Sequence, residues 1–314
     1  MSHLERALEL AERGRRTTHP NPVVGAVLVR DGEVVGEGWH ERAGGPHAEA
    51  AALEAAGERA RGATVYVTLE PCSHQGRTPP CADALVAAGV ARAVVGAADP
   101  NPEVNGRGLA RLREGGVEVE LVDCFDARCQ NEAWRMWVAH GRPFVTFKVA
   151  ATLDGRVTIP GDRWVSGEVS RRLVHELRAA SDAVAVGMGT VWADAPRLDP
   201  RGVDVLRQPR RLAFGSGPLP EGSALELRPG PLEAELRALA AERVQSLLLE
   251  GGPTLAGAFF DADLVDKLLV FVAPRLSGVG LGWPAGLARP VELHRFAMRR
   301  VGEDVLLSAY IHEP

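Results

Sequence analysis

Apolar positions near the N-terminus follow two different spacings, and each spacing predicts one kind of element. Between residues 4 and 11 leucine and alanine recur at helical spacing, and Ser2 with Glu5 forms a capping box ahead of them. The runs "VVGAVLVR" and "EVVGEGW" follow, joined by Asp31 and Gly32, a pair typical of a two-residue hairpin turn. The chain is therefore predicted to begin with an amphipathic helix and a hairpin.

Helix-like and strand-like segments then alternate up to about residue 140. The predicted helices cover residues 47–56, 80–88, 106–116 and 124–140, and the predicted strands cover residues 63–69, 91–97 and 117–122. Alternation at these lengths is typical of a sheet with helices on its faces. Gly141 and Pro143 end the last helix before a new apolar run, so a domain boundary is predicted near residue 143.

The same alternation resumes in the second half. The predicted strands cover residues 144–155, 182–187, 210–215, 245–250, 266–274 and 304–312, and the predicted helices cover residues 166–179, 231–243 and 253–262. "GVGLG" at residues 278–282 has no suitable strand before it and no helix after it, which favours a loop over a dinucleotide fingerprint. We therefore expect two α/β domains, 1–143 and 144–314.

Composition narrows the class of partner and the cellular compartment. The 314 residues are 46% hydrophobic, enough for two cores, and 36 Lys and Arg stand against 41 Asp and Glu. This mild acidity favours a small-molecule substrate over nucleic acid. The N-terminus does not resemble a signal peptide, and no apolar run approaches membrane-spanning length, so a cytoplasmic protein with no membrane partner is expected.

Two segments carry candidate metal chemistry, "GPHAEAAALEAAG" and "TLEPCSHQGRTPPC". A reducing compartment disfavours a disulfide between Cys72 and Cys81. A zinc ion that does chemistry takes three protein ligands and keeps one position open, and His47 with these two cysteines supplies three. Glu49 lies near the ligands without being one, as in zinc nucleobase deaminases with a His-x-Glu and Pro-Cys signature. A structural ion held by four ligands and simple burial are the alternatives.

Cys124 and Cys129 lie on one helical stretch without a nearby histidine, so they are expected to be ordinary core or surface cysteines rather than ligands.

The long insert between the two cysteines identifies a family. Together with "TTHPNPVVGAV", "EGWHERAGGPHAE" and "DPNPEVNGRGL", it closely resembles the deaminase domain of the bifunctional deaminase/reductase of riboflavin biosynthesis. "KVAATLDGR", "ADAPRLDPR" and "EGGPTLAGAFF" are similar to the reductase domain of that family. The resemblance implies a cytidine-deaminase-like three-layer αβα domain, followed by a dihydrofolate-reductase-like α/β domain.

The resemblance also implies two consecutive reactions and two cofactors. The first domain would use Zn²⁺ to remove the 2-amino group of 2,5-diamino-6-(5-phosphoribosylamino)pyrimidin-4(3H)-one. The second would use NADPH to reduce the ribose, giving 5-amino-6-(5-phosphoribitylamino)uracil. His47, Cys72 and Cys81 match the zinc ligands, Glu49 matches the proton carrier, and Asn21 matches a substrate amide. Within the insert, His74 and Arg77 are expected to touch the pyrimidine or its phosphate.

In the second domain most assignments depend on the resemblance. The positions that match cofactor contacts are Ala151, Trp164, Thr190, Asp194 and Ser216, and those that match substrate contacts are Lys148, Arg178, Leu198, Arg201 and Glu250. Gly251 and Gly252 are assigned without the resemblance. A strand followed by two glycines and a helix lets backbone amides approach a phosphate.

Three departures from the family pattern bear on the reductase half. Asp162 stands where a substrate-contacting serine can occur, and a carboxylate there would repel a phosphate unless a cation intervenes. Gly215 stands where an acidic residue can occur, and the segment from about Gly217 to Gly230 is short. The alternatives are a deaminase whose second domain only binds a ligand or partner, and a zinc-stabilised interaction protein. A transfer-RNA or nucleotide deaminase is a further alternative, which the mild acidity and the attached α/β domain disfavour. A homo-oligomer is expected in each enzyme case.

Overall fold

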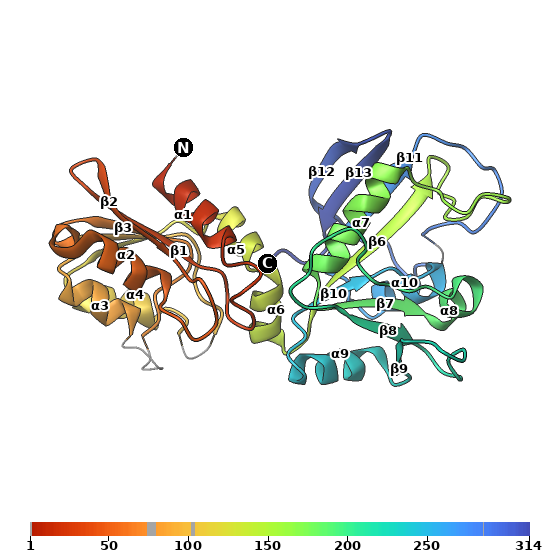
Figure 1. Cartoon of the computed structure of the whole chain (residues 1–314), viewed down its shortest axis with the longest axis horizontal. Helices are drawn as coiled ribbons and strands as arrows, with labels where there is room; N and C mark the ends of the chain where they lie inside the picture. Colours follow the sequence, from red (N-terminus) through yellow and green to blue (C-terminus); the bar gives the residue numbers. More distant parts are fainter. Residues whose placement is uncertain (1, 74–79, 102–103, 285) are drawn as a thin grey trace. The chain divides into compact units, whose positions relative to one another are not determined.

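The structure of this chain is a computed structural model that describes residues 2–73, 80–101, 104–284 and 286–314 (Figure 1). Contacts divide it into two compact units, Met1–His140 (with Pro314) and Gly141–Glu313. No helix within the described residues is long and apolar enough to cross a membrane.

In its described part, the first unit has a five-stranded sheet in the order β2-β1-β3-β4-β5, antiparallel from β2 to β3 and parallel from β3 to β5. Its strands are β1 (Gly25–Arg30), β2 (Glu33–Trp39), β3 (Thr64–Val67), β4 (Arg92–Val95) and β5 (Glu118–Leu121). Its helices are α1 (His3–Glu12), α2 (Ala48–Ala56), α3 (Cys81–Ala87), α4 (Arg107–Glu114), α5 (Phe125–Gln130) and α6 (Glu132–His140), with a 3₁₀ turn at Gly57–Ala60.

Alternation along the inner strand β1 produces two cores in this unit. Ala26 and Leu28 pack with α2, α3 and α4 on one face, whereas Val27 and Val29 pack with α1 on the other (Figure 1). Successive residues of a strand point to opposite faces, so one apolar strand serves both layers. The three-layer arrangement follows from this pattern.

The predicted N-terminal elements are confirmed. Glu5 N donates to the hydroxyl of Ser2 at 3.2 Å, and Ser2 N donates to the carboxylate of Glu5 at 2.7 Å, which is the complete capping box. Asp31 and Gly32 both have positive φ, as the expected hairpin turn requires.

The single helix predicted over residues 124–140 is wrong, because α5 and α6 are separate helices that meet at Asn131. The Asn131 amide pairs with the backbone of Val23: its Oδ1 accepts from Val23 N at 2.9 Å and its Nδ2 donates to Val23 O at 2.9 Å. Asn131 is buried and has φ −116° and ψ 24°, outside helical values. A tertiary contact therefore interrupts a continuous helical pattern.

The described residues of the second unit form an eight-stranded sheet in the order β12-β13-β11-β6-β10-β7-β8-β9. Neighbouring strands from β11 to β9 are parallel, and β13 and β12 add antiparallel pairings at one edge. The strands are β6 (Phe144–Thr152), β7 (Ala183–Gly187), β8 (Arg210–Phe214), β9 (Glu226–Arg228), β10 (Ser246–Leu249), β11 (Lys267–Ala273), β12 (His294–Val301) and β13 (Asp304–Tyr310). The helices are α7 (Glu168–Ala180), α8 (Met188–Asp194), α9 (Leu232–Ala241) and α10 (Pro253–Asp261).

Helices cover both faces of this second sheet. Leu236 and Leu239 of α9 and Phe259 of α10 join the larger core, and Val174 of α7 and Val191 of α8 lie in cores that do not include α9 or α10. Because β6, β10, β7 and β8 are parallel, their carboxyl ends lie along one edge of the sheet. Open parallel sheets bind ligands at this edge.

Three elements of the second unit were missed from the sequence. Helix α8 has a weak helical sequence, "MGTVWAD", and β9 has only three residues. Strand β12, "HRFAMRRV", has charged and apolar residues exposed almost throughout, so no burial period marks it as a strand. The predicted loop at residues 278–282 is confirmed, since these residues belong to no helix.

Candidate functional site

The three predicted metal ligands come together in the first unit. One ligand atom from each of His47, Cys72 and Cys81 lies within 4.8 Å of the others. Nδ1 of His47 is 3.2 Å from Sγ of Cys81 and 3.7 Å from Sγ of Cys72. Two thiols and an imidazole form a soft donor set suited to zinc, and three ligands leave a tetrahedral position free.

Two of these ligands lie at the starts of helices, and the third follows a strand. His47 is the N-cap of α2, Cys81 is the first residue of α3, and Cys72 follows β3 and accepts from Cys81 N at 3.4 Å. Gly38 allows α2 to reach the sheet, because a Cβ on it would lie 2.5 Å from Ala48 O. Helix N-termini favour anionic groups, so thiolates are stabilised here.

Hydrogen bonding and burial shift the acidity of the cluster. The hydrogen bond with Cys81 lowers the pKa of Cys72 and that with Cys72 raises the pKa of Cys81, so the pair holds a first thiolate easily and a second one reluctantly without a cation. The same cluster raises the pKa of His47, with Cys72 the main cause. Glu49 is buried, and burial raises its pKa to about 7.

Asn21 has a partner that sequence reasoning missed. Its Nδ2 lies 3.2 Å from Nε2 of His40, a buried histidine whose Nδ1 lies 2.9 Å from Pro46 O. The rings of His40 and His47 meet edge to face, with centroids 5.5 Å apart. The structure therefore joins the predicted substrate amide to the metal cluster through His40, which lies within the motif "EGWHERAGGPHAE" but was given no role from the sequence.

Glu70 is a second residue that sequence reasoning missed. Its buried carboxylate accepts backbone N–H groups of Gly106 (3.0 Å), Gly108 (2.9 Å), Leu109 (3.2 Å) and Asp99 (3.3 Å). It thereby caps α4 from another element and fixes the segment after β4 beside the chain that leads into Cys72. The position of Glu70 two residues before the ligand Cys72, in "LEPC", was the sequence signal that could have identified it.

His74 and Arg77, predicted to contact substrate, lie outside the described residues. The part of the insert that the structure describes, Cys72 and Ser73 before them and Pro80 and Cys81 after them, includes both cysteine ligands.

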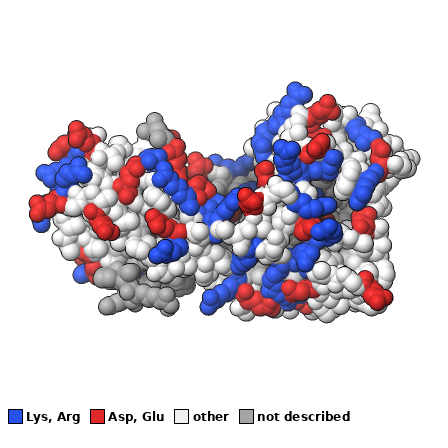
Figure 2. All heavy atoms as spheres, in the orientation of Figure 1, with Lys and Arg blue, Asp and Glu red and all other residues white. Residues whose placement is uncertain are grey.

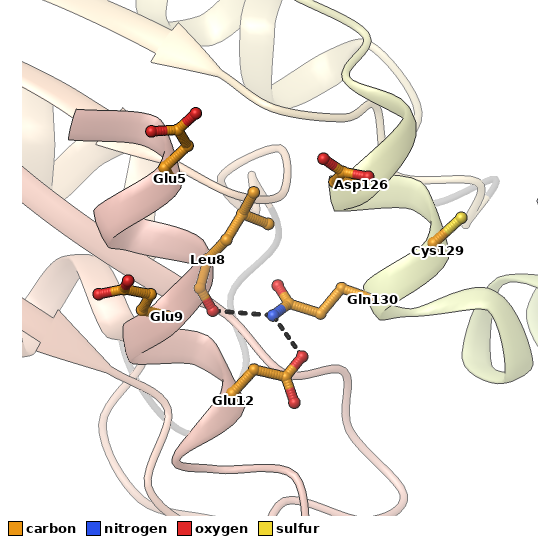
Figure 3. A pocket seen from close by; sticks show the side chains of 7 residues that line it. All are labelled: Glu5, Leu8, Glu9, Glu12, Asp126, Cys129 and Gln130. Atoms are coloured by element: carbon orange, nitrogen blue, oxygen red, sulfur yellow. Dashed lines mark hydrogen bonds between the residues drawn. The ribbon is translucent and has the colours of Figure 1, made fainter. Parts of the chain in front are cut away.

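A separate hollow lies between α1 and α5 of the first unit (Figure 3). It has a volume of ≈ 590 Å³ and is lined by Glu5, Leu8, Glu9, Glu12, Asp126, Cys129 and Gln130. Gln130 Nε2 donates to Leu8 O at 2.8 Å and to Glu12 at 2.7 Å, which ties the two helices together. None of the predicted site residues lines it.

In the second unit the structure joins three predicted substrate residues around one carboxylate. Glu250 Oε2 lies 2.9 Å from Lys148 Nζ, and Glu250 accepts from Arg178 Nε at 2.6 Å and from Nη2 at 3.1 Å. The side chain of Glu250 is 6% exposed, and although burial opposes ionisation, Lys148 and Arg178 lower its pKa to about 2. Two cations on one carboxylate give this end of β6 and β10 a net positive charge.

Leu198 and Arg201 lie on the segment that follows α8. Leu198 is buried, so its side chain packs in the core and only its backbone can face a ligand. Arg201 is exposed, with Nε 3.6 Å from Asp199 Oδ1. Arg178 Nη1 donates to Asp199 O at 3.3 Å, which links this segment to the Glu250 cluster.

The predicted cofactor residues gather at the carboxyl ends of neighbouring strands. Gly252 is the N-cap of α10, and a Cβ on it would lie 3.5 Å from Thr190 Oγ1 of α8, so these two helix starts are neighbours. Asp194 and Ser216 are exposed, at the end of α8 and just after β8. Ala151 is buried in β6, which leaves its backbone as the group that could face a cofactor.

Trp164 is 49% exposed, with the guanidinium of Arg163 4.9 Å and that of Arg171 5.3 Å from its ring centre. A large exposed aromatic ring beside cations is a suitable surface for a planar, anionic ligand. The structure places it on the loop between β6 and α7.

Two of the departures from the family pattern, Asp162 and Gly215, have a structural explanation. Asp162 forms an ion pair with Arg275, which also donates from Nη1 to Trp164 O at 3.4 Å. A cation that offsets the charge of Asp162 is therefore present, on the segment after β11. Gly215 has φ 124°, a value that an acidic residue would rarely adopt.

The chain matches two family models. The Cytidine and deoxycytidylate deaminase zinc-binding region matches residues 1–97, and the RibD C-terminal domain matches residues 143–222 and 230–307. The first match includes the metal cluster and Glu49, and the second includes the Glu250 cluster and Trp164.

Full-length relatives and structures extend these matches. The riboflavin biosynthesis protein RibD of Escherichia coli is 42% identical over 97% of this chain and 97% of its own length, and that of Aquifex aeolicus is 37% identical over 98% and 97%. The Acinetobacter baumannii RibD structure matches with a TM-score of 0.84 at 36% identity, covering 98% of this chain and 97% of its own. A Thermotoga maritima diaminohydroxyphosphoribosylaminopyrimidine deaminase/5-amino-6-(5-phosphoribosylamino)uracil reductase matches with a TM-score of 0.82 at 34% identity, over 98% and 97%.

Proposed function

The chain belongs to the RibD family of riboflavin biosynthesis proteins, and from this premise we propose which of its residues carry the deamination and which carry the reduction. It is a bifunctional enzyme, a zinc-dependent deaminase and an NADPH-dependent reductase that act in turn on a phosphoribosylaminopyrimidine. Its fold is a cytidine-deaminase-like domain followed by a dihydrofolate-reductase-like α/β domain. The deaminase-only alternative is not supported, because both family models match and Asp162 has its compensating cation.

We assign the metal to His47, Cys72 and Cys81, and the observation that carries this assignment is their convergence within 4.8 Å. Zinc bound there supplies a Lewis acid that activates water near neutral pH. The Glu49 carboxylate takes a proton from the attacking water, delivers one to the ring nitrogen, and assists the departure of ammonia. The Asn21 amide, oriented by His40, holds the pyrimidine over the cluster.

For the reduction, we assign the substrate to the Glu250 cluster and the segment that carries Leu198 and Arg201. An arginine has five N–H donors, and three of those on Arg178 are engaged by Glu250 and Asp199, which leaves two for a substrate phosphate. Glu250 orients Lys148 and Arg178 rather than meeting the anionic substrate itself, since its carboxylate is buried and paired.

NADPH, which supplies the hydride, is assigned to the carboxyl edge of β6, β10, β7 and β8. The N-terminus of α10 at Gly251 and Gly252 faces the cofactor phosphates, with Thr190, Asp194 and Ser216 around them. Trp164 and the backbone of Ala151 complete the cofactor contacts. The division of labour, deamination within residues 1–143 and reduction within 144–314, is part of the same proposal.

One coupled assay tests the whole assignment. Purified enzyme with bound zinc, given the diaminopyrimidine phosphate and NADPH, is expected to release ammonia first and then to oxidise one NADPH for each ammonia. Ammonia release without NADPH oxidation would refute the reductase half. Faster deamination of cytidine or deoxycytidylate would refute the substrate.

We further propose a cytoplasmic homo-oligomer whose partners are small molecules, without nucleic acid or membrane. On the face of the molecule that Figure 2 shows, acidic and basic side chains are interspersed. This agrees with the small difference between 36 basic and 41 acidic residues. Light scattering and a nucleic-acid binding assay on the purified enzyme test these expectations.

A further inference from the structure

His175 contacts the backbone of the segment after α8 that carries Leu198 and Arg201. The proposed function gives this histidine no role. It lies on α7, one turn before Arg178, and is half-buried. Its Nδ1 is 3.1 Å from Arg201 N and 3.2 Å from Asp199 O. A single ring atom therefore contacts a backbone donor and a backbone acceptor of the same short segment.

These two contacts are mutually exclusive as hydrogen bonds. A ring nitrogen carries either a lone pair or a hydrogen. With the lone pair on Nδ1, His175 accepts the N–H of Arg201, and Asp199 O keeps the donor it already has, Arg178 Nη1 at 3.3 Å. With a hydrogen on Nδ1, the ring points a donor at the donor of Arg201. The neutral ring with its hydrogen on Nε2 leaves both Arg201 N and Asp199 O with a partner.

The surrounding charges favour that neutral form. Burial lowers the pKa of His175, and the positive charges of Arg178, on the same helix, and Arg201, on the facing segment, lower it further. Asp199 O and the Glu250 carboxylate oppose this with a smaller effect. The acceptor on Nδ1 is consequently present at neutral pH and is lost when acid protonates the ring.

Three of the contacts that hold the segment after α8 lie between Leu198 and Arg201. Leu198 is buried and has φ 55°, Asp199 O accepts from Arg178, and Arg201 N donates to His175. The third contact lies at the residue whose exposed guanidinium is assigned to the substrate. Loss of it releases the backbone of Arg201 and leaves its side chain held by Asp199, while the first two contacts stay in place.

We propose that His175 is a positioning residue of the reductase site, which holds Arg201 in place for the substrate phosphate through its neutral Nδ1. The inference rests on the proposed function, because Arg201 is a substrate residue only if the second unit reduces the phosphoribosyl compound. No motif in the sequence marks His175. Protonation of its ring would make substrate binding by the reductase sensitive to acid.

Two substitutions separate positioning from simple packing. His175→Asn keeps an acceptor close to the place of Nδ1 and cannot be protonated in this range, whereas His175→Leu keeps bulk and removes the acceptor. With 5-amino-6-(5-phosphoribosylamino)uracil and NADPH at pH 7.5, His175→Leu is expected to raise the KM for the uracil substrate about tenfold, with kcat within about threefold. His175→Asn is expected to stay near the parent enzyme.

The pH profile provides a readout that a packing role would not change. In the parent enzyme the KM is expected to rise as pH falls from 7.5 to 5.5, and in His175→Asn this rise is expected to be smaller. The substrate phosphate titrates near pH 6 itself, but that contribution is common to both enzymes and cancels in the comparison. His294→Leu, at an exposed histidine of β12, is the matched control.

The outcomes distinguish a failure of the proposed function from a failure of the role assigned to His175. A parent enzyme that releases ammonia but never oxidises NADPH refutes the proposed function. A parent enzyme that reduces normally, together with an unchanged KM in His175→Leu, refutes the role of His175 alone. Equal pH profiles for the parent and His175→Asn also overturn the inference, and they do so even if His175→Leu fails to fold.

Discussion

Nε2 of His40 accepts a hydrogen bond from Nδ2 of Asn21 at 3.2 Å, and this contact sets the direction of the Asn21 amide. The Pro46 carbonyl, 2.9 Å from Nδ1 of His40, can only accept, so Nδ1 carries the hydrogen and Nε2 the lone pair. The Asn21 Oδ1 is then left without this partner and, under the proposed assignment, is available to a donor of the pyrimidine. A buried histidine thus orients the residue that we assign to the substrate.

His40→Ala is expected to slow deamination and leave reduction intact. The Asn21 amide loses its partner, and an unmade hydrogen bond at a site of this kind costs roughly ten- to a hundredfold in kcat/KM. Ammonia release is measured with the diaminopyrimidine phosphate, and NADPH oxidation with the deaminated compound. A similar loss in both reactions would indicate damage to the whole chain rather than to Asn21.

Glu49→Gln is expected to lower deamination by roughly 10²- to 10⁴-fold while one zinc per chain is retained, because the amide cannot carry the proton. Glu54→Gln is the matched control, since Glu54 lies on the same helix α2 and is exposed. Metal content by atomic emission and ammonia release are measured together. Loss of zinc in Glu49→Gln would make Glu49 a ligand or a structural residue instead.

Arg275→Met is expected to raise the KM for NADPH or for the uracil substrate at least tenfold, because it leaves the Asp162 carboxylate unpaired near a phosphate. Two unit charges about 4 Å apart interact by about 1 to 4 kcal/mol at a protein surface. Asp162→Ser is expected to stay within about threefold of the parent, and the double variant is expected to match Asp162→Ser. Additive effects of the two substitutions would contradict this compensation.

His312 is expected to make the second unit less stable at high pH. Its Nδ1 lies 2.9 Å from the fully buried carboxylate of Asp266, and that hydrogen bond raises the pKa of His312. A raised folded-state pKa means that the stabilisation is complete below the unfolded value of about 6.5 and disappears as pH rises through the folded value.

The free energy of unfolding of the parent and of His312→Gln should therefore differ more at pH 5.5 than at pH 9. Urea unfolding followed by hydrogen exchange in β6 and β11 reports on this unit. His294→Gln on β12 provides an exposed control. An equal difference at both values of pH would show that His312 acts through packing alone.

Local patterns predicted those elements whose cause is local. The capping box of Ser2 and Glu5, the positive-φ turn at Asp31 and Gly32, and most helix and strand positions depend on neighbours in the chain. Helix α8 and strand β12 were missed because their sequences have neither strong propensity nor a burial period, and the break at Asn131 depends on Val23, far away in the chain.

By itself the sequence determined the chemistry that this protein can perform, since the identities of His47, Glu49, Cys72 and Cys81 define a soft metal site with an acid beside it. The tertiary structure decided which groups orient that chemistry. The contacts of His40 with Asn21, of Arg275 with Asp162, and of His175 with Arg201 join residues whose separation along the chain carries no period. Short-range propensities cannot encode such pairs, because packing of whole elements brings them together.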